Sequence, residues 1–223
     1  MHKIIKNCGV CGKSNLEKSI ELKKFPLTGV IIKRKIRKFT NYFDQNINIC
    51  KNCGHIQLNK FLSRKSLYDE RYTFRTSASH LSNQSIKYFK DFLFKCHKKK
   101  NLGNVLEIGC NDIKLLENLK NNSHSVFGID PIWKNRKKPN KKNFTIIGDY
   151  VENVNFKKVI KKNINIFVNT HNLEHIENPY QLLKKVVNFS DKNAHFFVEV
   201  PDADLMIKNY RFDQVFHQHY HYF

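Results

Sequence analysis

Five short apolar runs in the second half of the chain constrain the fold more than any other feature of the sequence. The runs are NVLEIG, SVFGID, FTIIGD, INIFVN and HFFVEV, and each ends in or beside one of the polar residues Glu107, Asp130, Asp149, Asn169 and Glu199. Continuous apolar runs of this length predict strands that are buried on both faces. Successive polar residues are 19 to 30 positions apart, which leaves room for helical crossovers and so predicts a parallel α/β sheet.

Helices are expected between and before these strands. The intervals predict crossover helices at residues 115–121, near Trp133, near Val159 and at residues 179–189. Upstream, Ile86, Phe89 and Leu93 recur at three- and four-residue spacing, which predicts an amphipathic helix. Open parallel sheets bind ligands beyond the carboxyl ends of their strands, so the polar residues that end the runs are candidates for a ligand site.

The end of the first run has the pattern of a nucleotide-binding turn. Glu107 precedes Gly109, and Asp130 lies 21 residues after the glycine. Gly109 lets the backbone approach a ligand, and an acid at the end of the second strand accepts hydrogen bonds from both ribose hydroxyls. Asn111 and Ile113 occupy the places of a second and a third glycine. Asn tolerates a positive φ, whereas Ile is strained there, so the loop either has an ordinary φ at Ile113 or is impaired.

The small number of glycines in this loop favours one class of ligand. A pyrophosphate needs several close approaches of the backbone, whereas a ligand without a pyrophosphate does not. The sequence therefore favours S-adenosylmethionine over NAD as the cofactor. The alternative is a packing turn of the kind that any doubly wound sheet can contain.

Two cysteine pairs near the start of the chain have the spacing of a metal site. Cys8 and Cys11 form one pair, Cys50 and Cys53 form the other, and 38 residues separate the pairs. Two residues between thiolates let both sulfurs face one ion, and the glycine after each pair lets the backbone turn its amides towards sulfur. The sequence predicts a closed four-thiolate site for structural zinc, with a redox pair as the alternative.

The segment between the cysteine pairs and the two remaining cysteines are less informative. Residues 19–49 alternate apolar and polar side chains, which predicts short strands that bring the pairs together. Cys96 and Cys110 have no partner at metal-ligand spacing and are expected to be single surface or core thiols.

The chain carries a formal net charge of +21, from 40 Lys and Arg against 19 Asp and Glu. Phosphate and base recognition favours Arg, whereas Lys predominates here, and the runs at 98–100, 137–142 and 157–162 carry few aromatics for base stacking. We therefore interpret the basic side chains as a solvated surface and do not expect a nucleic-acid partner. The sequence contains no apolar run near the ~18 residues of a membrane span and no signal peptide, which predicts a cytoplasmic protein.

Several short blocks occur together in the order found in one family. They are the two cysteine pairs, Phe25-Pro-Leu-Thr-Gly29, Leu67-Tyr-Asp-Glu-Arg-Tyr72, Thr76-Ser-Ala-Ser79, residues 105–116, Gly128-Ile-Asp-Pro131, Asn172-Leu-Glu-His-Ile176 and residues 212–223. With these blocks the chain resembles the S-adenosylmethionine-dependent sugar methyltransferases that carry an N-terminal zinc-binding domain, among them C-methyltransferases of nucleotide-linked keto-sugars. The resemblance implies a zinc-binding domain at residues 1–62, a helical connector at 63–100 and a Rossmann-like class I methyltransferase domain at 101–223.

The resemblance also implies roles for individual residues. The cofactor would be held by Glu107, Gly109, Asn111 and Asp130, which contact its amino-acid and ribose parts, and by Asp149 near its adenine. His175, at the end of the fourth strand, and His219, in the final segment, would face the sugar. In the family the terminal segment usually has Tyr and Glu where this chain has Phe216 and Gln218, whereas His219 and Tyr222 are retained.

The chemistry of methyl transfer supports the same candidates. A nucleophile must lie in line with the sulfonium methyl group and must lose a proton, which an imidazole with a pKa of about 6.5 can accept. His219 is the candidate base, His175 a candidate donor or orienting residue, and Tyr222 a further catalytic candidate. As alternatives, His175 is a helix-entry residue that caps Glu177 and Asn178, and His219 is a partly buried ring. His217, His219 and His221 could instead share a strand face as metal ligands.

Members of the family continue well beyond the segment that corresponds to residues 212–223, with two further strands and a second domain. The resemblance therefore predicts a methyltransferase domain that is incomplete at its C-terminus, with the strand at 195–200 near a sheet edge. A second chain that completes the fold is a candidate partner, besides the nucleotide-sugar substrate. The alternative functions are an RNA methyltransferase with a zinc module and an inactive zinc-binding remnant.

Overall fold

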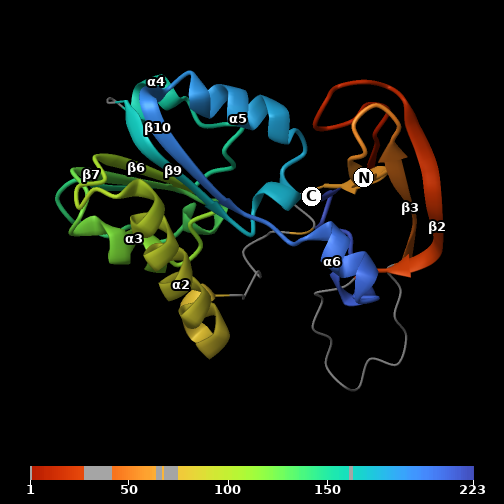
Figure 1. Cartoon of the computed structure of the whole chain (residues 1–223), viewed down its shortest axis with the longest axis horizontal. Helices are drawn as coiled ribbons and strands as arrows, with labels where there is room; N and C mark the ends of the chain where they lie inside the picture. Colours follow the sequence, from red (N-terminus) through yellow and green to blue (C-terminus); the bar gives the residue numbers. More distant parts are fainter. Residues whose placement is uncertain (1, 28–41, 64–66, 68–74, 161–162) are drawn as a thin grey trace. The chain divides into compact units, whose positions relative to one another are not determined.

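The structure is a computed structural model that describes residues 2–27, 42–63, 67, 75–160 and 163–223 (Figure 1). By packing, the chain divides into two compact units. One comprises residues 1–67, 173–181 and 200–223, and the other comprises residues 68–172 and 182–199. Across the described residues, every helix is too short or too polar to cross a lipid bilayer.

The unit formed by residues 68–172 and 182–199 contains a five-stranded parallel sheet. In chain order its strands are β6 (Asn104–Ile108), β7 (Ser125–Ile129), β8 (Phe144–Ile147), β9 (Ile164–Thr170) and β10 (Ser190–Glu199). They lie in the order β10-β9-β6-β7-β8, with every neighbouring pair parallel. All five predicted strands are therefore confirmed, and the sheet is the Rossmann-like α/β sheet that the sequence predicts. The strand order reverses at β6, which places the switch point between β6 and β9.

Helices cover both faces of this sheet (Figure 1). The helices are α2 (His80–His97), α3 (Lys114–Lys120), α4 (Phe156–Val159) and α5 (Pro179–Val187), and a 3-10 turn, η2 (Pro131–Trp133), stands where a crossover helix was expected near Trp133. Helix α2 buries Ile86, Phe89 and Leu93 in the same apolar core as β6 and α3, as the three- and four-residue spacing predicts. The side chain of Ser79 caps this helix by accepting a hydrogen bond from the N–H of Ser82.

The other unit is built on antiparallel strands. Its four-stranded sheet has the order β11-β4-β3-β2, formed by β2 (Leu16–Pro26), β3 (Tyr42–Cys50), β4 (Ile56–Leu58) and β11 (His221–Tyr222), and β1 (His2–Ile4) pairs with β5 (Lys60–Leu62). Strands β2 and β3 are longer than the short strands expected between the cysteine pairs. Residues 28–41 between them lie outside the described residues, as do Thr28 and Gly29 of one family block and residues 68–72 of another.

The terminal segment packs with the N-terminal strands in this unit. Strand β11 pairs with β4, the ring of Tyr220 stacks on Phe61 at a centroid distance of 4.1 Å, and the Tyr220 hydroxyl donates to the carbonyl of Leu62. Between β10 and β11 lie α6 (Ala203–Lys208) and the 3-10 turn η4 (Phe212–Gln214). The division into three domains at residues 62 and 100 stays a prediction.

The strand expected near a sheet edge does lie at an edge. Strand β10 is the outermost strand of the described parallel sheet, beside β9. Its side chains Phe196 and Val198 are 37% and 40% exposed, whereas Phe197, between them, is buried in the core. This alternation differs from the fully buried pattern of the central strands β6 and β7.

Candidate functional sites

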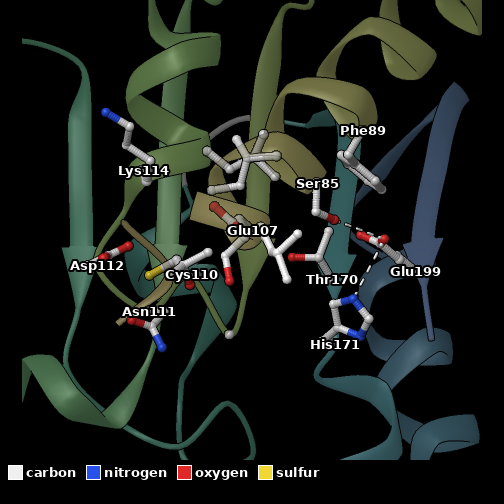
Figure 2. Close-up of a pocket in the computed structure, with 16 residues that line it drawn as sticks. Ser85, Phe89, Glu107, Cys110, Asn111, Asp112, Lys114, Thr170, His171 and Glu199 are labelled. Carbon is white, nitrogen blue, oxygen red and sulfur yellow. Dashed lines mark hydrogen bonds and ion pairs between the residues drawn. The ribbon is translucent and has the colours of Figure 1, made fainter. Parts of the chain in front are cut away.

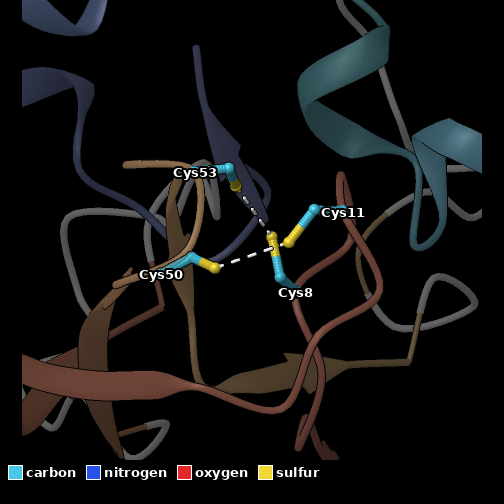
Figure 3. Close-up of side chains that lie close together, drawn as sticks. All are labelled: Cys8, Cys11, Cys50 and Cys53. Carbon is cyan, nitrogen blue, oxygen red and sulfur yellow. Dashed lines mark hydrogen bonds between the residues drawn. The ribbon is translucent and has the colours of Figure 1, made fainter.

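The four cysteines predicted to bind metal lie together (Figure 3). Their sulfurs all lie within 4.8 Å of one another, with Cys8 Sγ 3.7 Å from Cys53 Sγ and Cys11 Sγ 3.6 Å from Cys50 Sγ. A tetrahedron with zinc–sulfur bonds of ~2.3 Å places its sulfurs about 3.8 Å apart, so the observed spacing fits a zinc ion. The four thiolates complete a tetrahedron, and such a site is structural.

Backbone turns present these sulfurs to the ion. Gly12 and Gly54 have φ angles of 73° and 75°, and their N–H groups close tight turns on the carbonyls of Cys8 and Cys50. Burial raises the pKa of Cys50, but hydrogen bonds from the backbone of Asn52 and Cys53 and from neighbouring thiols lower the pKa to about 7. At Cys50 the amides therefore favour the thiolate that a metal ion requires. Burial raises the pKa of Cys8 and raises that of Cys53 to about 12, so at these two cysteines the bound ion itself must displace the proton.

A cavity of about 350 Å³ opens at the carboxyl ends of the parallel strands (Figure 2). It is lined by α2, by the loop between β6 and α3, and by the ends of β9 and β10. Among the residues expected to bind the cofactor, Glu107, Gly109 and Asn111 line this cavity. Asp130 and Asp149 are not among the described residues that line it. The volume lies within the range of about 300 to 1,000 Å³ typical of small-molecule pockets.

The loop after β6 keeps the left-handed backbone of a glycine-rich turn although it holds one glycine. Gly109, Asn111 and Ile113 have φ angles of 78°, 41° and 63°. Of the two expectations for this loop, an ordinary φ at Ile113 is therefore wrong. A non-glycine residue in this region costs roughly 1–3 kcal/mol, and burying an Ile side chain contributes about 1.5–3 kcal/mol. The Ile113 side chain is 4% exposed and packs in the core, so its burial offsets the strain and leaves the cavity open.

Polar contacts hold this loop in place. The Asp130 carboxylate accepts hydrogen bonds from the backbone N–H groups of Asn111 (2.8 Å) and Ile132 (3.0 Å). The indole N–H of Trp133 donates to the carbonyl of Asn111 at 2.6 Å. Burial raises the pKa of Asp130, although these amides and the positive charges of Arg75 and Arg136 oppose the shift. The carboxylate thus binds the backbone of the loop, and Arg75 and Arg136 act on it electrostatically.

Gly109 has no room for a side chain. A Cβ at this position would lie 2.5 Å from Cγ of Asn172, which is held by a hydrogen bond from the Nδ2 group of Asn169. Asn169 is fully buried and also donates to the carbonyl of Ile108. The end of β9 therefore supports the end of β6 where Gly109 meets the cavity.

Glu107 is a buried carboxyl group on the cavity wall. Burial, and secondarily the charges of Asp130 and Asp112, raise its pKa to about 8. Its Oε2 atom has no hydrogen-bond partner within the part of the chain that the structure describes. At neutral pH this carboxyl group is largely protonated, and a cationic ligand would favour its ionised form. Asp149, in the loop after β8, accepts hydrogen bonds from the N–H of Tyr150 and the side chain of Asn153.

Sequence reasoning missed one group of cavity residues at the ends of β9 and β10. His171 directly follows β9, and its Nε2 atom lies 3.6 Å from Oε1 of Glu199 (Figure 2). The hydroxyl of Ser85 donates to the same oxygen at 3.4 Å. The position of His171 immediately after an apolar strand is the signal that could have identified it. Glu199 was noted as a strand-ending acid, but not as a site residue.

The predicted catalytic histidines lie in the unit that contains the N-terminal strands. His175 belongs to the 3-10 turn η3 (Leu173–His175), so its expected place at the end of the fourth strand is corrected by five residues. The ring centroids of His175 and His219 are 5.0 Å apart, and the Nε2 atom of His175 lies 3.8 Å from Oε1 of Glu174. Phe216 packs on His219 at a centroid distance of 3.9 Å, and Tyr222 lies edge-on at 6.3 Å.

At the start of α5 the Oδ1 atom of Asn178 accepts the N–H of Gln181 at 3.0 Å, so Asn178 is the N-cap of this helix. A shared metal face of His217, His219 and His221 is wrong. His217 and His221 face other partners than His219: the Nε2 atom of His217 lies 3.3 Å from the carbonyl of Phe25, and Nδ1 of His221 lies 2.9 Å from Nε2 of His55. Among the described residues, the three alternate histidines form no common metal cluster.

Together, the parallel sheet, its left-handed loop and the four-thiolate site define a class: a methyltransferase fold combined with a small zinc-binding unit. A family model described as "Methyltransferase domain" matches residues 78–223, and one described as "Putative zinc binding domain" matches residues 8–68. Because the first match covers more than half of the chain, the chain belongs to the methyltransferase-domain family.

Individual relatives are distant. The chain is 23% identical to the C-methyltransferase NovU of Streptomyces niveus over 98% of its own length and 53% of the relative, so it spans about half the length of this curated protein. Among solved structures it is similar to the plantazolicin methyltransferase BpumL in complex with a triazolic desmethylPZN analog and SAH, with 20% identity, a TM-score of 0.47, and 70% and 58% of the two chains covered. The N-methyltransferase NodS of Bradyrhizobium japonicum WM9 with S-adenosyl-L-homocysteine gives 14% identity, a TM-score of 0.44, and coverages of 60% and 68%.

Replacing Cys50 with Ser is expected to abolish zinc binding at the four-cysteine site, because it removes one of four thiolates from a closed site. Loss of the ion should also destabilise the antiparallel sheet by several kcal/mol. Elemental analysis of the purified chain and thermal unfolding measure both effects. The matched control is Cys96→Ser, which changes an exposed cysteine outside the cluster and should keep the zinc. A zinc content in Cys50→Ser equal to that of the unmodified chain would contradict the assignment of the site.

The raised pKa of Glu107 predicts a pH-dependent stability difference. Because its pKa lies above its ordinary value of 4.5, the folded state retains a proton that the unfolded state loses as the pH rises from about 4.5 to about 8. Glu107→Gln should therefore raise the free energy of unfolding above pH 8 by about 1 to 4 kcal/mol, since each pKa unit corresponds to ~1.4 kcal/mol. The gain should vanish near pH 4.5. Denaturant titrations at several pH values measure it.

The control for this substitution is Glu117→Gln. Glu117 is partly exposed and accepts a hydrogen bond from Nζ of Lys141 at 2.7 Å, so its loss should change the free energy of unfolding by less than about 1 kcal/mol. A pH-independent gain in Glu107→Gln would show that the carboxyl group is already ionised at ordinary pH.

Proposed function

We propose that the chain is an S-adenosylmethionine-dependent methyltransferase that acts on a nucleotide-linked sugar, at carbon or oxygen. The observation that carries the proposal is the cavity at the carboxyl end of β6, where Gly109 and Asn111 present a left-handed backbone beside the buried Glu107. This is the switch point at which parallel sheets bind ligands. The sugar follows from the family blocks in the sequence, and NovU, the distant curated relative, is a C-methyltransferase.

The residues around the cavity suit a cationic cofactor. S-adenosylmethionine supplies an electrophilic methyl group on a positively charged sulfur. Glu107, Asp112 and Glu199 give the cavity three carboxyl groups. An ammonium group beside Glu107 would lower its raised pKa and convert it to an anion that accepts a hydrogen bond. We assign the amino-acid part of the cofactor to Gly109 and Asn111.

We assign the ribose and the adenine to the two acids that follow the next strands. Each Asp130 oxygen accepts one backbone hydrogen bond, and a carboxylate oxygen has a second lone pair for a ribose hydroxyl. Asp149 would lie near the adenine.

The acceptor must lose a proton during methyl transfer, and we assign this step to the histidines. The carbonyls of Gln218 and Gln214 accept hydrogen bonds from Nδ1 of His175 and His219, so the Nε2 atom of each neutral ring carries a lone pair. His219 is the proposed proton acceptor and His175 the orienting residue. Burial raises the pKa of Tyr222, so its hydroxyl stays protonated and can donate to an enolate oxygen of the acceptor.

Gly109→Ala is expected to abolish binding of S-adenosylmethionine, because the added Cβ meets Asn172 and the φ of 78° strains any L side chain. The matched control is Gly103→Ala. Gly103 has a φ of 66° and a Cβ there would meet Asn165, but Gly103 lies at the start of β6, away from the cavity lining. Isothermal titration calorimetry should show no binding of S-adenosylmethionine to Gly109→Ala. The folded molecules of Gly103→Ala should bind it with unchanged affinity. No binding to the unmodified chain would contradict the proposal.

The acceptor class has its own test. The chain should transfer labelled methyl groups from S-adenosylmethionine to a nucleotide-linked keto-sugar, and His219→Asn should lower the rate by about 10²- to 10⁴-fold without changing cofactor affinity. Transfer to RNA in preference to the sugar, with strongly salt-dependent RNA affinity, would contradict the sugar assignment and favour the RNA methyltransferase that the charge of +21 suggests. The control is His217→Asn, a buried histidine outside the cluster.

A further inference from the structure

Glu174, His175 and His219 form a second group of metal-ligating side chains, which we call the Glu-His-His cluster. One ligand atom from each of the three lies within 4.8 Å of the other two. Glu174 and His175 belong to η3, and His219 belongs to the segment before β11, in the same packing unit. The N–H of Tyr220 donates to the carbonyl of Glu174 at 2.8 Å, which ties the two segments together. The cluster is thus built by the fold and is separate from the four cysteines.

The two histidines are oriented as metal ligands usually are. A carbonyl only accepts hydrogen bonds, so Nδ1 carries the proton in both rings: in His175 it donates to Gln218 at 2.7 Å, and in His219 it donates to Gln214 at 3.0 Å. Metal-bound histidines almost always donate their other ring N–H to a carbonyl or carboxylate, which fixes the tautomer. Both Nε2 atoms are therefore free of a proton in the neutral rings.

The burial of the Glu-His-His cluster favours binding of a cation. Glu174 is 1% exposed and His219 is 6% exposed, so a carboxylate and imidazole lone pairs meet where water screens them poorly. The 3.8 Å between Glu174 Oε1 and His175 Nε2 is longer than a hydrogen bond but allows an ion to contact both atoms. Two imidazoles and a carboxylate suit zinc, cobalt or manganese, and three protein ligands leave a position open.

We propose that the Glu-His-His cluster binds one divalent cation of this class and that its open position takes an oxygen of the methyl acceptor. The second half of this inference rests on the proposed function. In the cation-loaded protein both rings would be ligands, so His219 would not be the base. The cation would lower the pKa of the bound acceptor, and the acceptor's proton would pass to solvent water. Phe216 and Gln218 stand where the resembled family usually has Tyr and Glu, and neither side chain can exchange a proton. The cation would supply the activation of the acceptor that these two side chains do not.

The test is a cobalt titration of the full chain with its four-cysteine site already filled by zinc. Calorimetry should give one further site, and the bound Co²⁺ should show visible d–d bands without thiolate-to-cobalt charge transfer, since oxygen and nitrogen are its ligands. Glu174→Gln and His219→Gln should each weaken the affinity at least tenfold. The matched control, His217→Gln, changes another buried histidine of the same segment and should leave the affinity unchanged.

Two results would overturn the inference: no cobalt bound beyond the cysteine site, or equal affinity in the variants and the unmodified chain. Circular dichroism identifies a variant that fails to fold. If either Glu174→Gln or His219→Gln does not fold, the cobalt affinity of the other is compared with that of the unmodified chain. Titration of the same zinc-loaded protein with S-adenosylmethionine separates the two proposals. Cofactor binding without cobalt binding contradicts the cation site alone, whereas cobalt binding without cofactor binding contradicts the proposed function.

Discussion

The hydrogen bond from the N–H of Asn111 to the carboxylate of Asp130 holds the loop on which the cavity depends. This hydrogen bond joins the loop after β6 to the end of β7. It helps to hold the positive φ angles of Asn111 and Ile113, which the single glycine of the loop, Gly109, would not impose by itself. The indole N–H of Trp133 donates a second hydrogen bond to the same residue, at the carbonyl of Asn111. Together the two bonds keep Asn111, which is not a glycine, in the left-handed conformation. The cavity beside Glu107 exists because this loop turns away from the strand end and its one β-branched residue, Ile113, points into the core.

Much of the parallel sheet could be predicted because its signals are local. Each apolar run is long enough to be buried on both faces, and the spacing of Ile86, Phe89 and Leu93 is one face of a helix. The cysteine site was predictable for the same reason, since two residues between thiolates and a following glycine specify a turn and a tetrahedral ion. Cys110, expected to be a single thiol, is buried in the core beside Gly128.

Features that depend on contacts between distant segments could not be predicted. Nothing near His221 indicates that its strand pairs with β4, because the partner lies more than 160 residues earlier in the chain. The meeting of Glu174 with His219 is of the same kind, since it needs η3 and the terminal segment to be placed together. The prediction of an ordinary φ at Ile113 was wrong because it considered only the backbone preference of a β-branched residue. Burial of the Ile113 side chain offsets the cost of the positive φ. The roles of the cofactor and sugar residues remain predictions, since they involve molecules beyond the chain.

The most direct measurement is a crystal structure of the chain with S-adenosylhomocysteine bound. The account predicts that the homocysteine carboxylate and ammonium lie against the loop of Gly109 and Asn111, with the ribose hydroxyls on Asp130. A ligand bound elsewhere on the molecule, or a cavity that stays empty at saturating ligand while the loop keeps its left-handed backbone, would contradict the account.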